Sequence, residues 1–208
     1  HRRDESHVAA GGSTLATQIE KYRHSPEGRT DTAREKLRQM ASASLRAYLD
    51  GENTLPRRRQ IVVDYLNTVP LSAMAGFGEV NGIGDGLWAF YGRDFADLNR
   101  LLSAAADDNE PALVKSRALA YKQALSLIVA QRRPSYYLAE GGPVLRQLTD
   151  SYLRLMTEAG VITPGLRDAA LPLDLNLQSQ LTVARPGSFI DQKAANAVRG
   201  KLQALLAV

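Results

Sequence analysis

Four side chains near the start of the chain have the types and the spacing that anion binding needs. The pair Gly11–Gly12 allows a sharp turn, after which Ser13 or Thr14 can cap a helix by accepting from its free N–H groups. Gln18 and Lys21 follow three residues apart and share one face of that helix. Hydroxyls, an amide and one cation at a helix start suit a polyanionic or pyrophosphate-bearing substrate. An ordinary capped surface helix would show the same residues.

The helix expected next carries charges of both signs in its first turns. Arg34, Lys36 and Arg38 cannot all face one way, but Arg34 and Arg38 share a face that could attract a pyrophosphate. Glu35 lies one turn before Gln39 and projects from the same face. Glu35 therefore either supplies a carboxylate at this place or is an exposed helix residue, and both interpretations stay open.

Five stretches of the chain carry a family resemblance: residues 11–21, 34–39, 61–67, 79–92 and 124–137. In that order they resemble the motifs of family 51 glycosyltransferases, the peptidoglycan polymerases found alone or as the front domain of bifunctional penicillin-binding proteins. The resemblance extends over roughly residues 8–140. Five ordered matches are far more specific than any one motif.

The resemblance implies both a reaction and a fold. Family members join lipid-linked disaccharides into glycan strands, and the 4-hydroxyl of one sugar displaces a lipid pyrophosphate from the anomeric carbon of the next. A carboxylate must take the hydroxyl proton, and cations or a divalent metal must stabilise the charge that grows on the pyrophosphate. The implied fold is all-α and lysozyme-like, with a head and a small membrane-facing jaw.

Site residues follow from the resemblance position by position. The substrate-binding positions are Gly12, Ser13, Thr14, Gln18, Lys21, Arg34, Lys36 and Asn67. Lys21 is the residue most expected to contact the pyrophosphate, as a point charge. A second catalytic carboxylate of the family falls on Gln39, with Glu35 as the neighbouring alternative. The catalytic base belongs to an earlier motif, so we expect it upstream of His1 and expect the first part of the family's domain to be missing.

Several positions depart from the family pattern. Thr17 stands where the family has its first Gln, Tyr22 stands at an Asn, and Gln39 stands at a Glu. Because glutamine binds metals weakly, the resemblance allows but does not require a Mg²⁺ or Mn²⁺ ion near the pyrophosphate. The same departures leave a second interpretation open, a catalytically decayed relative that binds lipid-linked substrate or glycan as a scaffold.

Composition and charge narrow the choice of partners. The 208 residues are 44% apolar, carry a net charge of +4 and include no cysteine. A basic chain favours anionic partners, nucleic acid or anionic lipid among them. The run 57–59 is three arginines without interleaved aromatic residues, so we expect no nucleic-acid partner. The expected partners are lipid-linked disaccharide pyrophosphate (lipid II), nascent glycan and a membrane surface.

No apolar run approaches the ~20 residues that span a bilayer. From the resemblance we expect the protein on the periplasmic side of a bacterial inner membrane. Because no apolar run here is long enough to be the anchor, we expect the anchor in a segment outside this chain.

Apolar periodicity and turn residues predict a chain of helices with few strand signals. The expected helices cover residues 13–22, 32–49, 56–67, 87–91, 94–105, 111–130, 143–159, 163–170 and 190–206. We expect loop over 68–86, and core positions at Trp88, Phe90 and Tyr91. Residues 1–172 are predicted to form a partial transglycosylase domain, and residues 173–208 a linker and the start of a following helical region.

Overall fold

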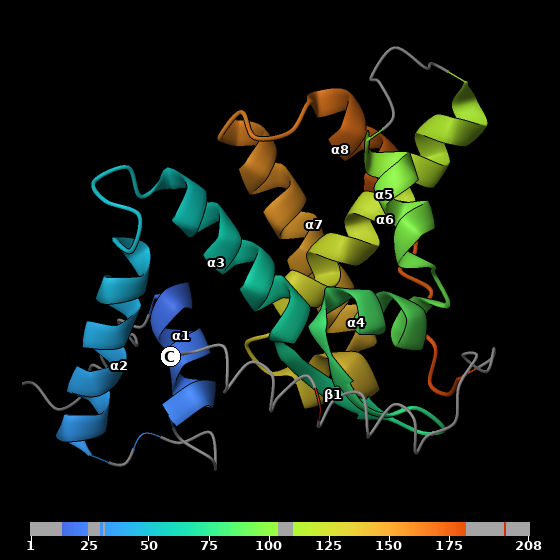
Figure 1. Cartoon of the computed structure of the whole chain (residues 1–208). Helices are drawn as coiled ribbons and strands as arrows, with labels where there is room; N and C mark the ends of the chain where they lie inside the picture. Colours follow the sequence, from blue (N-terminus) through green and yellow to red (C-terminus); the bar gives the residue numbers. More distant parts are fainter. Residues whose placement is uncertain (1–13, 25–29, 31, 104–109, 182–197, 199–208) are drawn as a thin grey trace, which may run out of the picture. The chain divides into compact units, whose positions relative to one another are not determined.

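The structure is a computed structural model that describes residues 14–24, 30, 32–103, 110–181 and 198. These residues are mostly helical and include a single two-stranded sheet (Figure 1). The all-α class predicted from the sequence is confirmed. The chain divides into two compact units: unit 1, residues 1–65 with 199–208, and unit 2, residues 66–198.

Unit 1 contains α1 (Leu15–His24), α2 (Ala33–Ala47) and most of α3 (Leu55–Thr68), which runs across the boundary. Thr32 caps α2, because its Oγ1 accepts from the Glu35 N–H at 3.1 Å. Helices α1 and α2 pack against each other.

Unit 2 is built mainly from helices. They are α4 (Gly82–Tyr91), α5 (Phe95–Ser103), α6 (Pro111–Ala130), α7 (Gly142–Glu158) and α8 (Pro164–Ala170), with a π-helical turn, η1, at Tyr136–Glu140. Asp94 and Thr163 accept from backbone N–H groups at the starts of α5 and α8. Both caps confirm what the sequence predicts at these positions.

A hairpin replaces much of the loop expected over 68–86. Strand β1 (Pro70–Met74) pairs antiparallel with β2 (Gly78–Asn81), and α4 begins at Gly82, five residues before the predicted start at Leu87. Gly76 and Gly78 adopt positive φ in or beside the turn, where glycine has no steric penalty. The loop prediction is wrong here because glycines and short apolar runs mark tight hairpins as well as loops.

The core of unit 2 is mainly apolar. Leu87, Leu127, Leu145 and Leu153 are fully buried, and the buried Tyr91 hydroxyl lies 2.6 Å from Ser126 Oγ. Phe90 and Tyr91 are core residues as predicted, while Trp88 is half-buried. Side chains of this kind make up most of the hydrophobic stabilisation of a domain.

A buried lysine attaches the segment after α8 to unit 2. The fully buried Lys122 donates to the carbonyls of Ala170, Leu171 and Leu173, at 2.7 to 3.2 Å. Farther on, Gln123 donates to the Leu175 carbonyl at 3.1 Å. The predicted division at residues 172 and 173 stays a prediction. Except for Val198, the helix expected over 190–206 lies outside the described residues.

Candidate functional site

The first group of predicted site residues lies at the start of α1. Gly12 and Ser13 are outside the described residues. Thr14 caps the helix, since its Oγ1 accepts from the Thr17 N–H at 3.3 Å and its carbonyl accepts from Thr17 Oγ1 at 2.8 Å. Thr17, which departs from the family pattern, is therefore a buried part of the cap.

Gln18 and Lys21 are half-exposed on α1. Within the described part of the chain, no carboxylate forms an ion pair with the Lys21 ammonium. An ammonium that is not neutralised by its own protein remains available to an anionic ligand.

Glu20, next to Lys21, is the centre of the contact between α1 and α2. Its side chain is fully buried, and its two oxygens accept from Ser42 Oγ at 2.6 Å and from Arg46 Nε at 2.8 Å. Charge-assisted bonds to both oxygens fix the carboxylate, and with it the rotation of α1 on α2. The sequence analysis did not identify Glu20. The only available signal was an acidic residue in the middle of a short helix with a basic residue on the next one.

Gln39 belongs to the same inward face of α2. It is fully buried, and its amide donates to Thr30 Oγ1 at 3.0 Å. Its neighbours one turn earlier, Glu35 and Lys36, are half-exposed. The structure thus places the neutral residue inside and the ionisable Glu35 nearer to solvent. Which of the two has a catalytic role stays a prediction.

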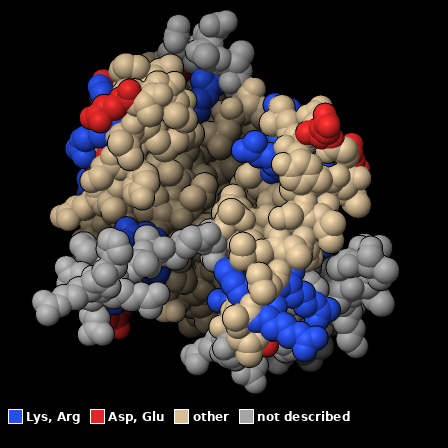
Figure 2. Space-filling view, turned by 90° about the vertical axis from the view of Figure 1, so that its left-hand side faces the viewer, with Lys and Arg blue, Asp and Glu red and all other residues tan. Residues whose placement is uncertain are grey.

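Arg34 and Arg38 lie on the opposite, exposed face of α2. Figure 2 shows Lys and Arg side chains gathered over the first turns of this helix. The N-terminus of a helix carries a partial positive charge, so basic residues there reinforce an anion-attracting field. The structure separates Arg34 from Lys36, so these two cannot contact one small anion from the same face of the helix.

The outward face of α2 is apolar beyond these arginines. Leu37 is 66% exposed and Leu45 is 73% exposed, Met40 is exposed on the helix as well, and Tyr48 and Leu49 are exposed directly after its end. The spacing of these apolar residues correctly predicts a helix, but in the structure the side chains face solvent and not the interior. Exposed apolar surface of this extent marks an interaction site.

Asn67 belongs to another group of motif residues, in unit 2. It is exposed at the end of α3, and its carbonyl oxygen lies 2.4 Å from the place of a Cβ at Gly82. Gly82 has a φ of +82° and donates to the Val69 carbonyl at 2.7 Å. The structure therefore brings two motifs together, and only glycine fits at residue 82.

The described residues do not fit a metal held by protein side chains. Among them, no group of three or more His, Asp or Glu side chains is placed to hold an ion. Gln39 is neutral and is already bonded to Thr30. No chemical step is assigned to a metal for this reason.

Comparison with known proteins gives one result. The family model described as Transglycosylase matches residues 2–156. No curated protein and no solved structure matches the chain significantly. Of the helices that the structure describes, none has the length and the apolar composition to cross a bilayer.

Proposed function

The chain belongs to the transglycosylase family, and from this premise we propose that it polymerises a lipid II-type disaccharide pyrophosphate into glycan strands. The family as a whole implies glycosyl transfer in peptidoglycan synthesis, and the mostly helical chain is consistent with its lysozyme-like fold. The finer assignments of substrate, residues and location rest on the arguments below.

One observation carries the proposal: the Lys21 ammonium, which forms no ion pair with the described residues, lies beside the contact between α1 and α2. Lys21 follows Glu20, whose bonds to Ser42 and Arg46 hold α1 on α2. This contact fixes the backbone from which the Lys21 side chain extends, so binding need order only the side chain. As the sugar–oxygen bond breaks, charge grows on the pyrophosphate, and a fixed cation stabilises that charge more than it stabilises the substrate.

The carboxylate roles are divided in the proposal. A carboxylate of the family's first motif takes the proton of the attacking hydroxyl. Glu35, half-exposed near the start of α2, is a carboxylate one helical turn before the family's second carboxylate position. Gln39 supports the helix from inside through Thr30 and has no charge to contribute.

A membrane surface is the proposed environment of α2. Its exposed apolar side chains follow the exposed Arg34 and Arg38 along the same face. A helix with these two features lies in the headgroup region, with apolar side chains in the lipid and cations at anionic headgroups. This arrangement suits a substrate with a lipid tail. We place the protein on the periplasmic side of a bacterial inner membrane, with its anchor outside this chain.

Turnover of labelled lipid II by the protein in its full natural length tests the proposal. Glycan products are separated by gel, and wild type is compared with Lys21→Ala and with Lys115→Ala, an exposed lysine of α6. We expect Lys21→Ala to lower the rate about 100-fold and Lys115→Ala to leave it unchanged. Equal rates for all three proteins would contradict the role of Lys21, and no polymer from wild type would contradict the enzymatic proposal.

A second candidate is the decayed relative that binds substrate or glycan as a scaffold. The observation in its favour is Gln39, which is neutral and buried where the family has a carboxylate. In the scaffold, lipid II binds without turnover and Glu35→Gln changes nothing. In the enzyme, Glu35→Gln lowers turnover about 100-fold while binding persists.

A further inference from the structure

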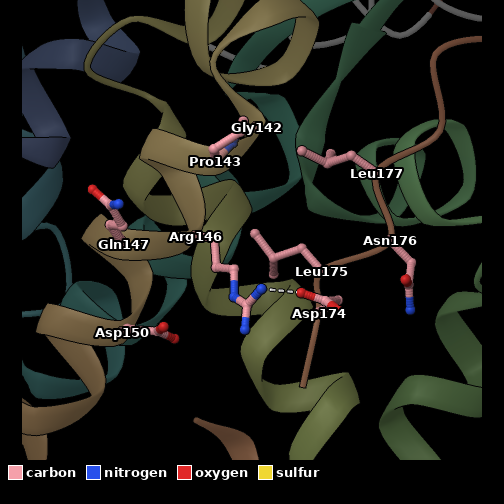
Figure 3. Close-up of a pocket in the computed structure, with 9 residues that line it drawn as sticks. All are labelled: Gly142, Pro143, Arg146, Gln147, Asp150, Asp174, Leu175, Asn176 and Leu177. Carbon is pink, nitrogen blue, oxygen red and sulfur yellow. Dashed lines mark hydrogen bonds and ion pairs between the residues drawn. The ribbon is translucent and has the colours of Figure 1, made fainter. Parts of the chain in front are cut away.

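We propose that unit 2 carries a second binding site, for an uncharged saccharide chain. A pocket of about 630 Å³ lies between α7, from Gly142 to Asp150, and residues 174–177. Figure 3 shows the extended segment running beside the helix, with Arg146, Leu175 and Leu177 directed between them and Gln147 and Asn176 at the outer rim. Sites for small organic ligands have volumes of this size. The pocket lies within unit 2 and shares no residue with the α1 and α2 positions.

The fixed acceptor of the pocket is Asp150. Its side chain is 16% exposed, and the buried Lys122 ammonium lies 2.7 Å from its Oδ1. That ammonium directs its donors at three backbone carbonyls, so Oδ1 accepts no well-aligned hydrogen bond from the described residues. A carboxylate has about four lone-pair sites. Oδ1 is buried against Lys122 and closed to a ligand, so the acceptor that Asp150 offers to the pocket is its other oxygen, Oδ2.

The charges at the rim are already matched. Arg146 donates to Asp174, and Figure 3 shows this pair joining the helix to the segment. With two carboxylates and one engaged guanidinium in its lining, the pocket does not suit a phosphate or another anion. Gln147 and Asn176, both exposed, add amides that can donate and accept at once. Hydroxyl groups also donate and accept, so they fit such a lining best.

Aliphatic side chains complete the lining. Leu175 is 4% exposed, and Figure 3 shows Leu175 and Leu177 pointing from the segment toward α7. Pro143 adds apolar surface on the helix side. A ligand must then offer C–H surface as well as many hydroxyls, which is the chemistry of a pyranose ring. The class of ligand, an uncharged sugar ring, rests on the lining alone; that such rings would be those of the growing glycan rests on the proposed function.

Titration of the isotope-labelled chain with chitotetraose, followed by amide resonances, tests this site without any lipid substrate. Failure of polymerisation therefore leaves the test intact. We expect shifts confined to residues 142–150 and 174–178. The double variant Gln147→Ala with Asn176→Gly removes both amides, and glycine tolerates the φ of 56° at residue 176. It should weaken binding about tenfold, for two lost hydrogen bonds.

A control variant and a second class of ligand make each result either support or overturn the proposed saccharide site. Arg154→Ala, an exposed change on α7 outside the pocket, should bind as wild type does. Asp150→Asn removes the counter-charge of a buried lysine and can unfold the chain, so the amide variants carry the test. The proposal is overturned if millimolar chitotetraose causes no shift, or if the double variant binds equally well. It is also overturned if tetra-alanine or inorganic pyrophosphate shifts these resonances in place of the saccharide.

Discussion

Helices α2 and α7 have similar amphipathic sequences, but only α7 buries leucines. In unit 2, α7 turns its apolar face inward, and Leu145 and Leu153 are fully buried. In unit 1, α2 buries Gln39 and leaves Leu37 and Leu45 exposed to solvent. The partner of each helix explains the difference, because α1 presents the buried carboxylate of Glu20 to α2.

The comparison shows that apolar periodicity specifies a helix but not the direction in which it faces. Leaving a Leu in water instead of burying it forgoes about 2 kcal/mol. Several exposed apolar side chains on one face of α2 therefore represent a considerable loss of hydrophobic stabilisation for unit 1. The loss disappears if that face meets lipid. Unit 2 thus buries its large apolar side chains, and we propose that unit 1 exposes its own as a surface for a substrate with a lipid tail.

The sharpest test of this contrast is a matched pair of leucines. Leu145→Ala in α7 should lower the free energy of unfolding by about 4 kcal/mol, through lost burial and a cavity. Leu45→Ala in α2, at a site 73% exposed, should change it by less than about 0.5 kcal/mol. Urea unfolding measures both. Equal losses would show that the outward face of α2 is packed in solution.

The polar contact inside unit 1 gives the next largest effect. Glu20→Ala leaves Arg46 and Ser42 without their acceptor and should cost about 3 kcal/mol. Glu158→Ala, an exposed change on α7, is the control and should cost almost nothing. Urea unfolding measures the stability of both variants. A Glu20 variant as stable as its control would contradict the claim that this contact holds α1 on α2.

Each unit has a glycine with a left-handed backbone, and the surroundings of the two glycines differ. Gly82 in unit 2 has φ +82° and the Asn67 oxygen against its Cβ position, while Gly51 in unit 1 has φ +97° and open space. Gly51→Ala should cost about 1 kcal/mol of backbone strain, and Gly82→Ala about 2 kcal/mol more because of the clash. Thermal melting of the two variants measures which of them loses more stability. The reverse order would contradict the packing of the two motifs.

The smallest effect concerns an exposed ion pair of unit 1. Arg57 donates to Asp50 at 2.5 Å and holds the pKa of that carboxyl below its ordinary value. A lowered folded-state pKa means that the pair stabilises the fold above the unfolded pKa and loses this effect as pH falls through the folded one. Carboxyl resonances should show Asp50 titrating lower in wild type than in Arg57→Gln. Identical titration would mean that the pair is absent in solution.

Local sequence signals predicted most of the helices, because caps and periodicity act over a few residues. Thr32, Asp94 and Thr163 cap helices by contacts that their own sequence neighbours supply. The hairpin at 70–81 was missed, since its pairing depends on glycine conformations and packing against α4 that spacing does not encode.

The candidate site was predicted less completely, because its central contact joins distant residues. Glu20 meets Ser42 and Arg46 across two helices, and no spacing rule links 20 with 46. The outward face of α2 follows from that contact, so it too was beyond prediction from the sequence. Lys21, by contrast, was identified from its helix face and its motif, and the structure leaves its ammonium without an ion pair among the described residues.

Sedimentation with vesicles tests most directly whether α1 and α2 bind a lipid pyrophosphate at a membrane. Phosphatidylglycerol vesicles with and without undecaprenyl pyrophosphate are compared for wild type, Lys21→Ala and Lys115→Ala. We predict that the pyrophosphate lipid increases binding of wild type and of Lys115→Ala, and that Lys21→Ala loses the increase but still binds plain vesicles. An increase that persists in Lys21→Ala, or no increase in wild type, would contradict the account.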